Sequence, residues 1–594
     1  MEAAHAAGQP LLAAAPRAPA AAPTCWGCDS ADLASALSLL LPLLPLDDRA
    51  RAACVSNAWR SAAAQPALWA ELDFERCAVT TYVQDDTLAA LCARAGPALR
   101  SLRLDVETCE EVTSVGIVTA LRDGGCVGVR RLSLRSDPSK HNFGRQGLTP
   151  ASAAALAAAC PLLEQAACAV TGVEAEAKDL AEAARALPGP LSLGLNGDES
   201  VVSSDDEQLR ALLLRAVVSL QLSECNIDDA GAVALAQALH ANTTLTELSL
   251  HGDVMTIGDV GCASLATMLR VNRTLTRLVL PDSTHGSGAA AGFAIGEALR
   301  VNTTLTDLAL SSLCFFEEGA AALVSALRVN TTLKSLTFFG NGGAGIADVD
   351  VAELGAALRV NAALTTLSLV GNGIGVEGAA SLGAALRVNA TLTFVNLAFN
   401  RIADEGAAAL ADALRVNATL KTLDISSNDI GALGAAALGE ALRVNAALTA
   451  LVLGGNMDEE DLDDDDMVGV GIQDDGAVAL AGALRVNTAL ASLELRRNGI
   501  GAEGAAALAE ALRVNTALAS LELTFNPVGD EGAVALAGAL RVNTTLETLH
   551  LCGHYRGCRN SRIGDDALAA LHEAELASAA VKRERGILGR VRWY

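Results

Sequence analysis

Apolar residues along most of the chain alternate between two spacings, first that of a short strand and then that of a helix. Residues 389–416 show both. Their first half ends in alternating apolar positions, typical of a strand with one buried face, namely Leu392, Val395 and Leu397. Their second half has apolar positions at helical spacing, namely Ala407, Leu410, Ala411 and Leu414. The pattern predicts one strand followed by one helix.

Polar residues predict where each helix begins and ends. Asp404 and Glu405 precede the helical stripe, where negative charge suits the positive end of the helix dipole. Arg415 falls in the last turn, where a cation suits the opposite end. Asn417 follows, and asparagine tolerates the left-handed conformation that ends many helices. We therefore expect a left-handed helix end at Asn417.

The same unit recurs through more than half of the chain. Its anchor asparagines lie 28 to 31 residues apart, except for one interval of 42 residues, and they are Asn242, Asn272, Asn302, Asn330, Asn361, Asn389, Asn417, Asn445, Asn487, Asn515 and Asn543. Ordering each residue costs roughly 1.5 kcal/mol, whereas burying one large aliphatic side chain returns about 1.5–3 kcal/mol. One unit cannot close a core, so the repeat predicts a stacked solenoid.

The consensus Leu-x-x-Leu-x-Leu-x-x-Asn-x-Ile-Gly, followed by a Gly-Ala-rich helix, resembles the leucine-rich repeat of the ribonuclease-inhibitor and RanGAP subtype. The resemblance implies an α/β solenoid, a curved horseshoe with parallel strands on its concave face and helices on its convex face. It also implies a ladder of asparagines after the strands, here Asn341, Asn372, Asn400, Asn428, Asn456, Asn498 and Asn526. We expect less regular turns where this position is occupied by Cys225, Asp253, Ser283 and Leu313.

Weaker copies of the strand pattern extend the array towards the N-terminus. They begin at Leu99 and Val129, continue at 163–170 and 191–195, and join the regular array at Val217. The predicted organisation is an Ala/Pro-rich leader at 1–28, a helical module at 29–75, degenerate repeats at 76–215, regular repeats at 216–571 with an acidic insertion at 457–470, and a cap with a basic tail at 572–594.

The helical module at 29–75 departs from the repeat. Pro45 and Asp47 fall between two helical stretches, and Val55 and Trp59 lie one helical turn apart. The motifs Leu44-Pro45-Leu46, Val55-x-x-x-Trp59-Arg60 and Pro66-x-Leu68-Trp69 resemble an F-box. A bundle this small needs a partner to cover its apolar side chains. A plain helical cap for the solenoid is the alternative.

An F-box, by this resemblance, binds a Skp-type adaptor within a cullin-based ubiquitin ligase, and the repeats that follow bind the protein substrate. The adaptor-binding residues carried over are Leu37, Leu44, Pro45, Val55, Trp59, Pro66, Leu68 and Trp69. Such a chain is a non-catalytic receptor, for which we expect no cofactor, no metal and no catalytic residue.

Residues that alternate with the buried leucines must point outward from each strand, and they are the candidate substrate-binding residues. They are apolar in the middle units and charged in the late units: Phe339, Val370, Phe394, Asp424, Glu494 and Arg496. An apolar patch flanked by charge is typical of a protein interface. The alternative is that Phe338, Phe339 and Phe394 pack under neighbouring loops.

Charge and cysteine usage narrow the function classes. The formal net charge of −26 disfavours binding to nucleic acid or to an anionic membrane, and no apolar run is long enough to cross a bilayer. The 14 cysteines lack paired spacing, which indicates reduced thiols and favours the cytoplasm or the nucleus. The leader lacks the basic start of a secretory signal, and an organelle transit peptide remains the alternative.

Several local motifs have weaker interpretations. The Cys-x-x-Cys pair at 25–28 lacks the strand–helix context of a redox motif. Cys552, His554 and Cys558 are zinc-ligand types, but their spacing favours an irregular terminal turn. The acidic run 458–466 lacks the turn glycine of a calcium loop, so we interpret it as a solvated loop, with docking of a basic partner as the alternative. The basic tail is interpreted as a helix that closes the last turn.

Two other functions stay open. One is an interaction scaffold with a helical cap and no ligase. The other is a GTPase activator, because the repeat subtype resembles RanGAP. That activity needs an exposed arginine in a strand-to-helix loop, and Arg401 has that placement. Binding of a Skp-type adaptor or stimulation of GTP hydrolysis distinguishes these functions.

Overall fold

The chain divides into two compact units, Met1–Ile257 and Gly258–Tyr594. The structure, a computed structural model, describes residues 70–73, 85–105, 112–135, 150–171, 191–196, 217–223, 227–251, 256–280, 289–311, 317–340, 346, 348–455, 471–551, 563–584 and 592–593. The F-box-like motifs, the cysteine pair at 25–28 and the acidic run 458–466 lie outside these ranges. So do the three zinc-ligand types of the terminal turn and the early ladder positions from Cys225 to Leu313.

In the first unit, parallel strands follow one another in chain order. They are β1 (Glu71–Asp73), β2 (Ser101–Asp105), β3 (Arg131–Arg135), β4 (Gln165–Thr171), β5 (Leu191–Asn196), β6 (Val217–Ser223) and β7 (Glu247–His251). Helical segments between them are α4 (Asp85–Ala95), η3 (Gly96–Ala98), α5 (Ser114–Asp123), α6 (Pro150–Ala159) and α9 (Asp229–His240). Their register keeps equivalent positions opposite one another, as in Leu72, Leu102 and Leu132. The weak strand patterns before the regular array are therefore confirmed as β2–β6.

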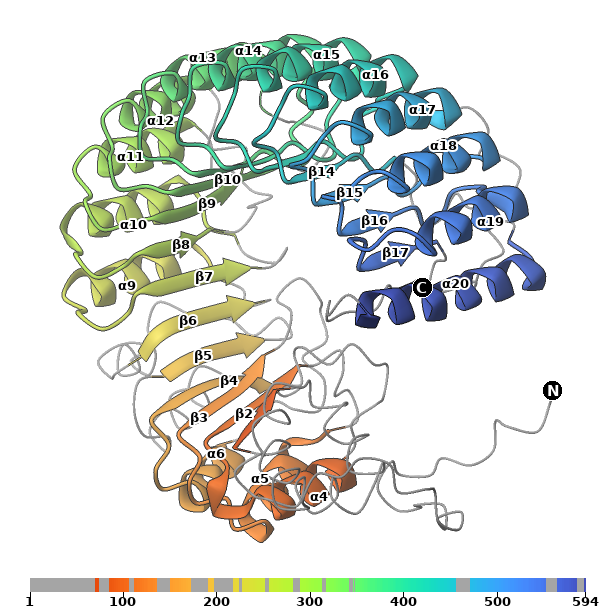
Figure 1. The fold of residues 1–594 in the computed structure, drawn as a ribbon. Helices are drawn as coiled ribbons and strands as arrows, with labels where there is room; N and C mark the ends of the chain where they lie inside the picture. Colours follow the sequence, from red (N-terminus) through yellow and green to blue (C-terminus); the bar gives the residue numbers. More distant parts are fainter. Residues whose placement is uncertain are drawn as a thin grey trace, which may run out of the picture. The chain divides into compact units, whose positions relative to one another are not determined.

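The second unit alternates one short strand with one helix, as predicted. Its strands are β8 (Arg277–Val279), β9 (Asp307–Ser311), β10 (Ser335–Phe339), β11 (Thr366–Ser368), β12 (Phe394–Asn396), β13 (Thr422–Asp424), β14 (Ala450–Val452), β15 (Ser492–Glu494), β16 (Ser520–Glu522), β17 (Thr548–His550) and β18 (Arg592–Trp593). Its helices are α10 (Asp259–Val271), α11 (Ala289–Leu299), α12 (Glu317–Leu327), α13 (Asp348–Leu358), α14 (Val376–Leu386), α15 (Ala403–Leu414), α16 (Ala432–Leu442), α17 (Gln473–Leu484), α18 (Ala502–Leu512), α19 (Gly529–Leu540) and α20 (Asp565–Glu584). Within this unit the strands line the inner side and the helices the outer side (Figure 1).

The core of the second unit is a thin layer of leucine and alanine between the sheet and the helices. In the unit at 389–416, Leu392, Leu397 and Leu410 are each 0% exposed. Small residues let adjacent helices approach: a Cβ added at Gly383 of α14 would come within 2.8 Å of the Ala409 carbonyl oxygen of α15. The parallel sheet and its helical cover establish the leucine-rich-repeat solenoid that the sequence predicts.

The predicted asparagine ladder is present wherever the structure describes it. Asn400 Oδ1 accepts hydrogen bonds from the N–H groups of Asn372 and Ile374, both at 3.0 Å, in the preceding turn. Its Nδ2 group donates to the Leu369 carbonyl oxygen at 2.9 Å. Equivalent cross-turn bonds are made by Asn372, Asn428, Asn498 and Asn526. Each amide therefore satisfies buried backbone groups of a neighbouring turn; Asn341 and Asn456 lie outside the described residues.

The expectation of a left-handed helix end at Asn417 is wrong, because this residue is not among those with positive φ. Asn417 is instead a buried cap. Its Oδ1 accepts from the N–H groups of Thr419 and Leu420, at 3.0 and 2.8 Å. Its Nδ2 donates to the carbonyl oxygen of Leu386 at 2.7 Å. The anchor asparagine thus lies between the helix and the next strand and joins two turns.

Cysteine occupies this anchor position in two turns of the first unit. Cys126 lies three residues before the buried Val129, and its Sγ is 3.4 Å from the Cys92 carbonyl oxygen. Cys160 repeats the arrangement, with its Sγ 3.9 Å from the Cys126 carbonyl oxygen. Burial raises the pKa of Cys160 to about 12. The prediction of buried free thiols is confirmed for Cys92, Cys126, Cys160 and Cys262.

Aspartates at the start of α13, α15, α17 and α19 cap the helix of the following turn. Asp404 Oδ1, in the first turn of α15, accepts from the N–H groups of Gly431 and Gly434 at the start of α16, both at 2.8 Å. Equivalent bonds reach the next turn from Asp348, Asp474 and Asp530. The predicted acid at the helix start is confirmed, and it also satisfies helix N–H groups one turn away.

The C-terminal tail adds a strand as well as a helix. The basic tail is predicted to be a helix, and α20 includes its first part up to Glu584. Arg592 and Trp593 then pair in parallel with Thr548 and Leu549 of β17. The interpretation of the whole tail as helical is therefore wrong at Arg592, because β17 offers an unpaired edge that the chain end covers.

Candidate protein-binding surface

The outward side chains of β10–β17, here called the inner face, form files that run across the sheet. The last residue of each strand from β11 to β17 belongs to one file, which the strand register aligns as Ser368, Asn396, Asp424, Val452, Glu494, Glu522 and His550. The residues two positions later form a second file, which includes Val370, Ala398, Ser426, Gly454, Arg496 and Thr524. Because the leucines between the files are buried, the surface composition is set by these outward positions.

One part of the inner face, here called the apolar end, consists of Phe339, Val370 and Phe399. Phe339 is 39% exposed, whereas its neighbour Phe338 is 0% exposed and packs in the core. The Gly340 N–H donates to the Val370 carbonyl oxygen at 3.1 Å, which places Val370, just after β11, beside Phe339. The alternative that the pair packs under loops thus applies to Phe338 and not to Phe339.

Phe399 lies at the same end of the strands, because the N–H of Gly371, which follows Val370, donates to the carbonyl oxygen of Ala398, which precedes Phe399, at 3.0 Å. Its side chain is 63% exposed, and its φ of 58° lies in the left-handed region, which is costly for a bulky side chain. The corresponding residue of another turn, Phe525, has the same φ and stacks under the Arg497 guanidinium at 4.8 Å. A strained and exposed aromatic ring adds apolar surface that the fold does not require.

The structure separates Phe394 from Phe339. Phe394 pairs with Thr366, which pairs with Ser335, so Phe394 aligns with the beginning of β10. Phe339 ends β10, four residues later, which is about 13 Å along a strand. The two rings therefore do not form one patch, although both face outward. Phe394 is partly exposed at the opposite end of its strand.

The later strands carry what we call the acidic end, formed by Asp424, Glu494 and Glu522. Partial burial raises the pKa of Glu494, and the neighbouring carboxylates of Glu522 and Asp424 raise it further, against smaller opposite effects of Arg496 and His550. His550 Nδ1 contacts the Glu522 carboxylate. The structure thus brings Asp424 and Glu494 together in one file and places Arg496 in the next.

Two of these features were missed from the sequence. Phe399 precedes the ladder asparagine, where other turns have Gly371 or Ser427, and an aromatic residue at that position was the available signal. The contact of His550 with Glu522 joins neighbouring strands, and its signal was that both occupy the last position of their strands. Arg401 is exposed in a strand-to-helix loop, as expected, and its N–H donates to the Ile374 carbonyl oxygen at 2.8 Å.

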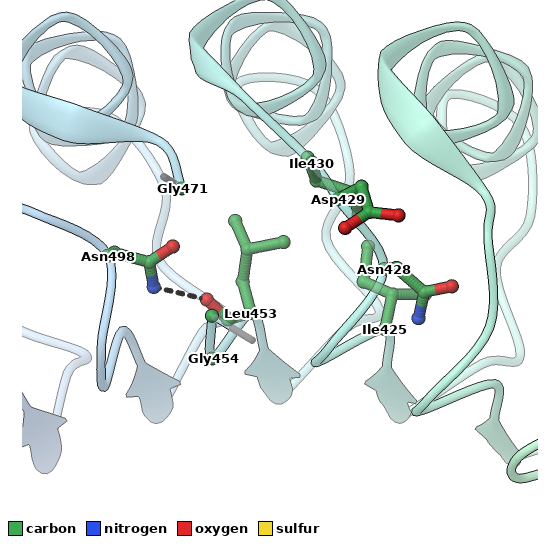
Figure 2. Close-up of a pocket in the computed structure, with 9 residues that line it drawn as sticks. Ile425, Asn428, Asp429, Ile430, Leu453, Gly454, Gly471 and Asn498 are labelled. Carbon is green, nitrogen blue, oxygen red and sulfur yellow. Dashed lines mark hydrogen bonds between the residues drawn. The ribbon is translucent and has the colours of Figure 1, made fainter. Parts of the chain in front are cut away.

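A small hollow lies behind the strands, where the chain approaches the acidic insertion. Figure 2 shows its lining, which includes Ile425, Leu453 and Asn498, with the Asn498 amide donating to the Leu453 carbonyl oxygen. It encloses about 260 Å³ of empty space, open solvent included, which is below the usual volume of a ligand site. Gly455 borders it, and a Cβ there would lie 1.6 Å from the Arg497 carbonyl oxygen. The described lining therefore does not favour a ligand pocket.

Within the described residues, no group of three or more His, Cys, Asp and Glu side chains is arranged to hold a metal ion. Among the described helices, none is both long and apolar enough to span a membrane.

Comparisons with known proteins support the repeat assignment. A model of the leucine-rich repeat family matches residues 216–236, 360–383, 388–411, 416–439, 486–509 and 514–537. No curated protein matches the chain. Among solved structures, a chain of the yeast Rad7 and Elc1 complex is similar at 17% identity, covering 67% of this chain and 90% of that chain, with a TM-score of 0.43.

A second solved structure, actin-binding site 2 of leiomodin-1, is similar at 17% identity. It covers 36% of this chain and 93% of that chain, with a TM-score of 0.23. At these scores neither neighbour carries an argument about function. The matched family model and the stacked strand–helix turns agree, and the chain contains leucine-rich repeats.

Proposed function

We propose that the chain is a protein-binding receptor whose inner face recognises a protein substrate, and that its N-terminal module joins it to a cullin-type ubiquitin ligase. The observation that carries the first part is the inner face itself. An apolar end with two exposed phenylalanines leads, on a continuous parallel sheet, to an acidic end. Exposed aromatic surface bordered by charge is what a protein interface requires.

The second part rests on the sequence. The motifs around Leu44-Pro45, Val55-x-x-x-Trp59 and Pro66-x-Leu68-Trp69 resemble an F-box in order and spacing. In this proposal the module binds a Skp-type adaptor, and the repeats hold the substrate near a ubiquitin-conjugating enzyme. The chain itself supplies no catalytic group.

The adaptor test uses the full chain and a purified Skp-type adaptor. We expect binding at micromolar concentration, and its loss when Leu44→Ala is combined with Pro45→Ala. Circular dichroism and thermal melting of the variant show whether the repeats stay folded. If the wild-type chain does not bind the adaptor, the ligase role is wrong and a scaffold without a ligase takes its place.

The substrate test combines Phe339→Ala with Phe394→Ala, and also measures each change alone because the two rings lie apart. Loss of an aromatic anchor commonly costs about 2 kcal/mol or more of binding free energy. We expect weaker substrate recruitment with unchanged adaptor binding, measured by quantitative comparison of captured and ubiquitinated proteins. Equal recruitment by all three variants would exclude these two phenylalanines from the main site.

A further inference from the structure

We infer that the inner face binds an extended peptide segment that carries an apolar side chain and, a few residues away, lysine or arginine. This inference rests on the proposed function, because it names the chemistry of the partner that the inner face would recognise. Two properties of the surface carry it: the exposed aromatic rings at one end and the three neighbouring carboxylates at the other.

The apolar end offers a place for one large apolar side chain. Phe339 and Phe399 are 39% and 63% exposed, and Val370 lies between them in the strand order. The residue equivalent to Val370 in the next turn is the small Ala398, which is only 4% exposed. An apolar side chain placed there would cover rings that water now contacts.

The acidic end carries three carboxylates, of which only that of Glu522 is in contact with a basic side chain of the described residues, His550. The Glu494 carboxylate makes no hydrogen bond or ion pair with the described residues. Its neighbours in the file are Val452 and Glu522, and Asp424 lies one strand beyond Val452. Arg496 is the nearby cation on the adjacent file. A cationic side chain of the partner would offset the mutual repulsion of these carboxylates.

The register sets the spacing of the partner's residues. Neighbouring strands lie about 4.8 Å apart, and Val370 follows β11, whereas Asp424, Glu494 and Glu522 lie on β13, β15 and β16. The carboxylates are therefore about 10, 19 and 24 Å from the apolar end across the sheet. An extended peptide rises about 3.3 Å per residue, so its basic residues would lie roughly three to seven residues from the apolar anchor.

The experiment selects peptides from a random library of 16-residue sequences with the full-length chain. We expect enriched sequences to contain an aromatic or large aliphatic residue with lysine or arginine roughly three to seven positions away. The most enriched sequence is then made synthetically, and its affinity is measured by fluorescence anisotropy. We expect the affinity to fall as ionic strength rises.

Two variants separate the apolar and the charged contributions. Glu494→Gln with Glu522→Gln should weaken binding of the synthetic peptide roughly tenfold, because two partly exposed ion pairs are lost. Glu440→Gln with Glu503→Gln removes the same charge from exposed positions of α16 and α18, and should leave the affinity within about twofold. Phe339→Ala with Phe399→Ala should weaken binding at least as much as the inner carboxylate variant.

The other possible results distinguish failure of this inference from failure of the proposed binding surface. Neutral or acidic enriched peptides, or peptides insensitive to the inner carboxylates, would overturn the inference. If those peptides still needed Phe339 and Phe399, the inner face would remain the binding surface and the proposed function would stand. Absence of enrichment, or binding insensitive to both inner-face variants, would contradict the inference and the proposed inner-face site together.

Discussion

Each regular turn of the second unit uses asparagine side chains to satisfy backbone groups that leucine cannot. Asn400 lies after the strand and Asn417 after the helix, and both are almost fully buried. Their amides bond to the backbone of a neighbouring turn. A turn is therefore held by apolar contact and by side-chain hydrogen bonds that have no solvent substitute in the buried layer.

Replacing Asn400 tests the ladder. Asn400→Ala would leave the N–H groups of Asn372 and Ile374 and the Leu369 carbonyl oxygen without these partners. We expect a loss of about 2–4 kcal/mol in the free energy of unfolding, measured by urea denaturation and by faster hydrogen exchange at Ile374. Asn396→Ala, on the inner face, is the control and should cost under about 1 kcal/mol. Equal losses for the two variants would contradict the role of the ladder.

Glu494 gives a pH-dependent prediction. Its pKa in the folded chain is raised, first by partial burial of a side chain that still contacts solvent, and then by Glu522 and Asp424. The folded chain therefore binds this proton more tightly than the unfolded chain, and stability falls as pH rises through the interval between the two pKa values. We expect Glu494→Gln to remove this decline. Its urea midpoint should rise relative to wild type at pH above the ordinary glutamate range and match it more closely at about pH 4.

Glu440→Gln on α16 controls for the simple loss of one negative charge. Its midpoint difference from wild type should change less with pH than that of Glu494→Gln. A Glu494→Gln difference that stays constant between about pH 4 and pH 7 would show that the local carboxylates do not repel one another in solution.

At the scale of the element, the helices depend on caps supplied from outside their own turn. The first N–H groups of α16 reach Asp404, which belongs to α15. Glycine at the start of α16 leaves room for this carboxylate, and no side chain of α16 itself caps its first turn. The order of the turns therefore matters as well as their composition.

The change Asp404→Ala tests this dependence. Loss of a helix cap usually costs about 1 kcal/mol, and here the cost should appear in α16 although the altered residue lies in α15. We expect faster hydrogen exchange at Gly434 and Ala435 with little change inside α15. Glu405→Ala, at the next and exposed position, is the matched control. Faster exchange confined to α15 would show that Asp404 serves its own helix.

Helix and strand positions could be predicted because the spacing of leucine and alanine matches the buried positions of each turn. The cross-turn caps could not be predicted. Asp404 has the sequence position of an ordinary first-turn acid, and only the structure shows that Gly431 and Gly434 of the next turn lie beside it. The outward strand residues could be predicted because they alternate with buried leucines. The distance between Phe339 and Phe394 could not, because it depends on the register in which neighbouring strands pair. Phe399 was missed because apolar periodicity does not report the left-handed φ of the residue before the ladder asparagine.

At the scale of the molecule, the 42-residue interval does not interrupt the array. Leu451 of β14 pairs directly with Leu493 of β15, and the Asn498 amide donates to the Leu453 carbonyl oxygen at 2.5 Å. The ladder thus continues from the turn before the acidic insertion to the turn after it. The extra residues enter between a strand and a helix, where a solenoid accepts additions.

Deleting residues 458–466 tests this continuity. Since β14 and β15 already pair in register, we expect the melting temperature to stay within a few degrees, because surface changes usually cost under about 0.5 kcal/mol. Replacing the same residues by a Gly-Ser segment of equal length controls for the loss of charge. A large drop in melting temperature, or stabilisation of the intact chain by calcium, would show that the insertion is a structural or metal-binding element.

The capping aspartates have a consequence for how such an array can lengthen or shorten. Asp348, Asp404, Asp474 and Asp530 occur in alternate turns, and each serves the glycine-led helix that follows. Removing one turn would place two helices that supply a capping aspartate, or two glycine-led helices that need one, next to each other. Removing two consecutive turns would keep the alternation. The unit that can be duplicated or deleted without loss of a cap is therefore a pair of turns. Duplications or designed truncations of an even number of turns should be tolerated better than those of an odd number.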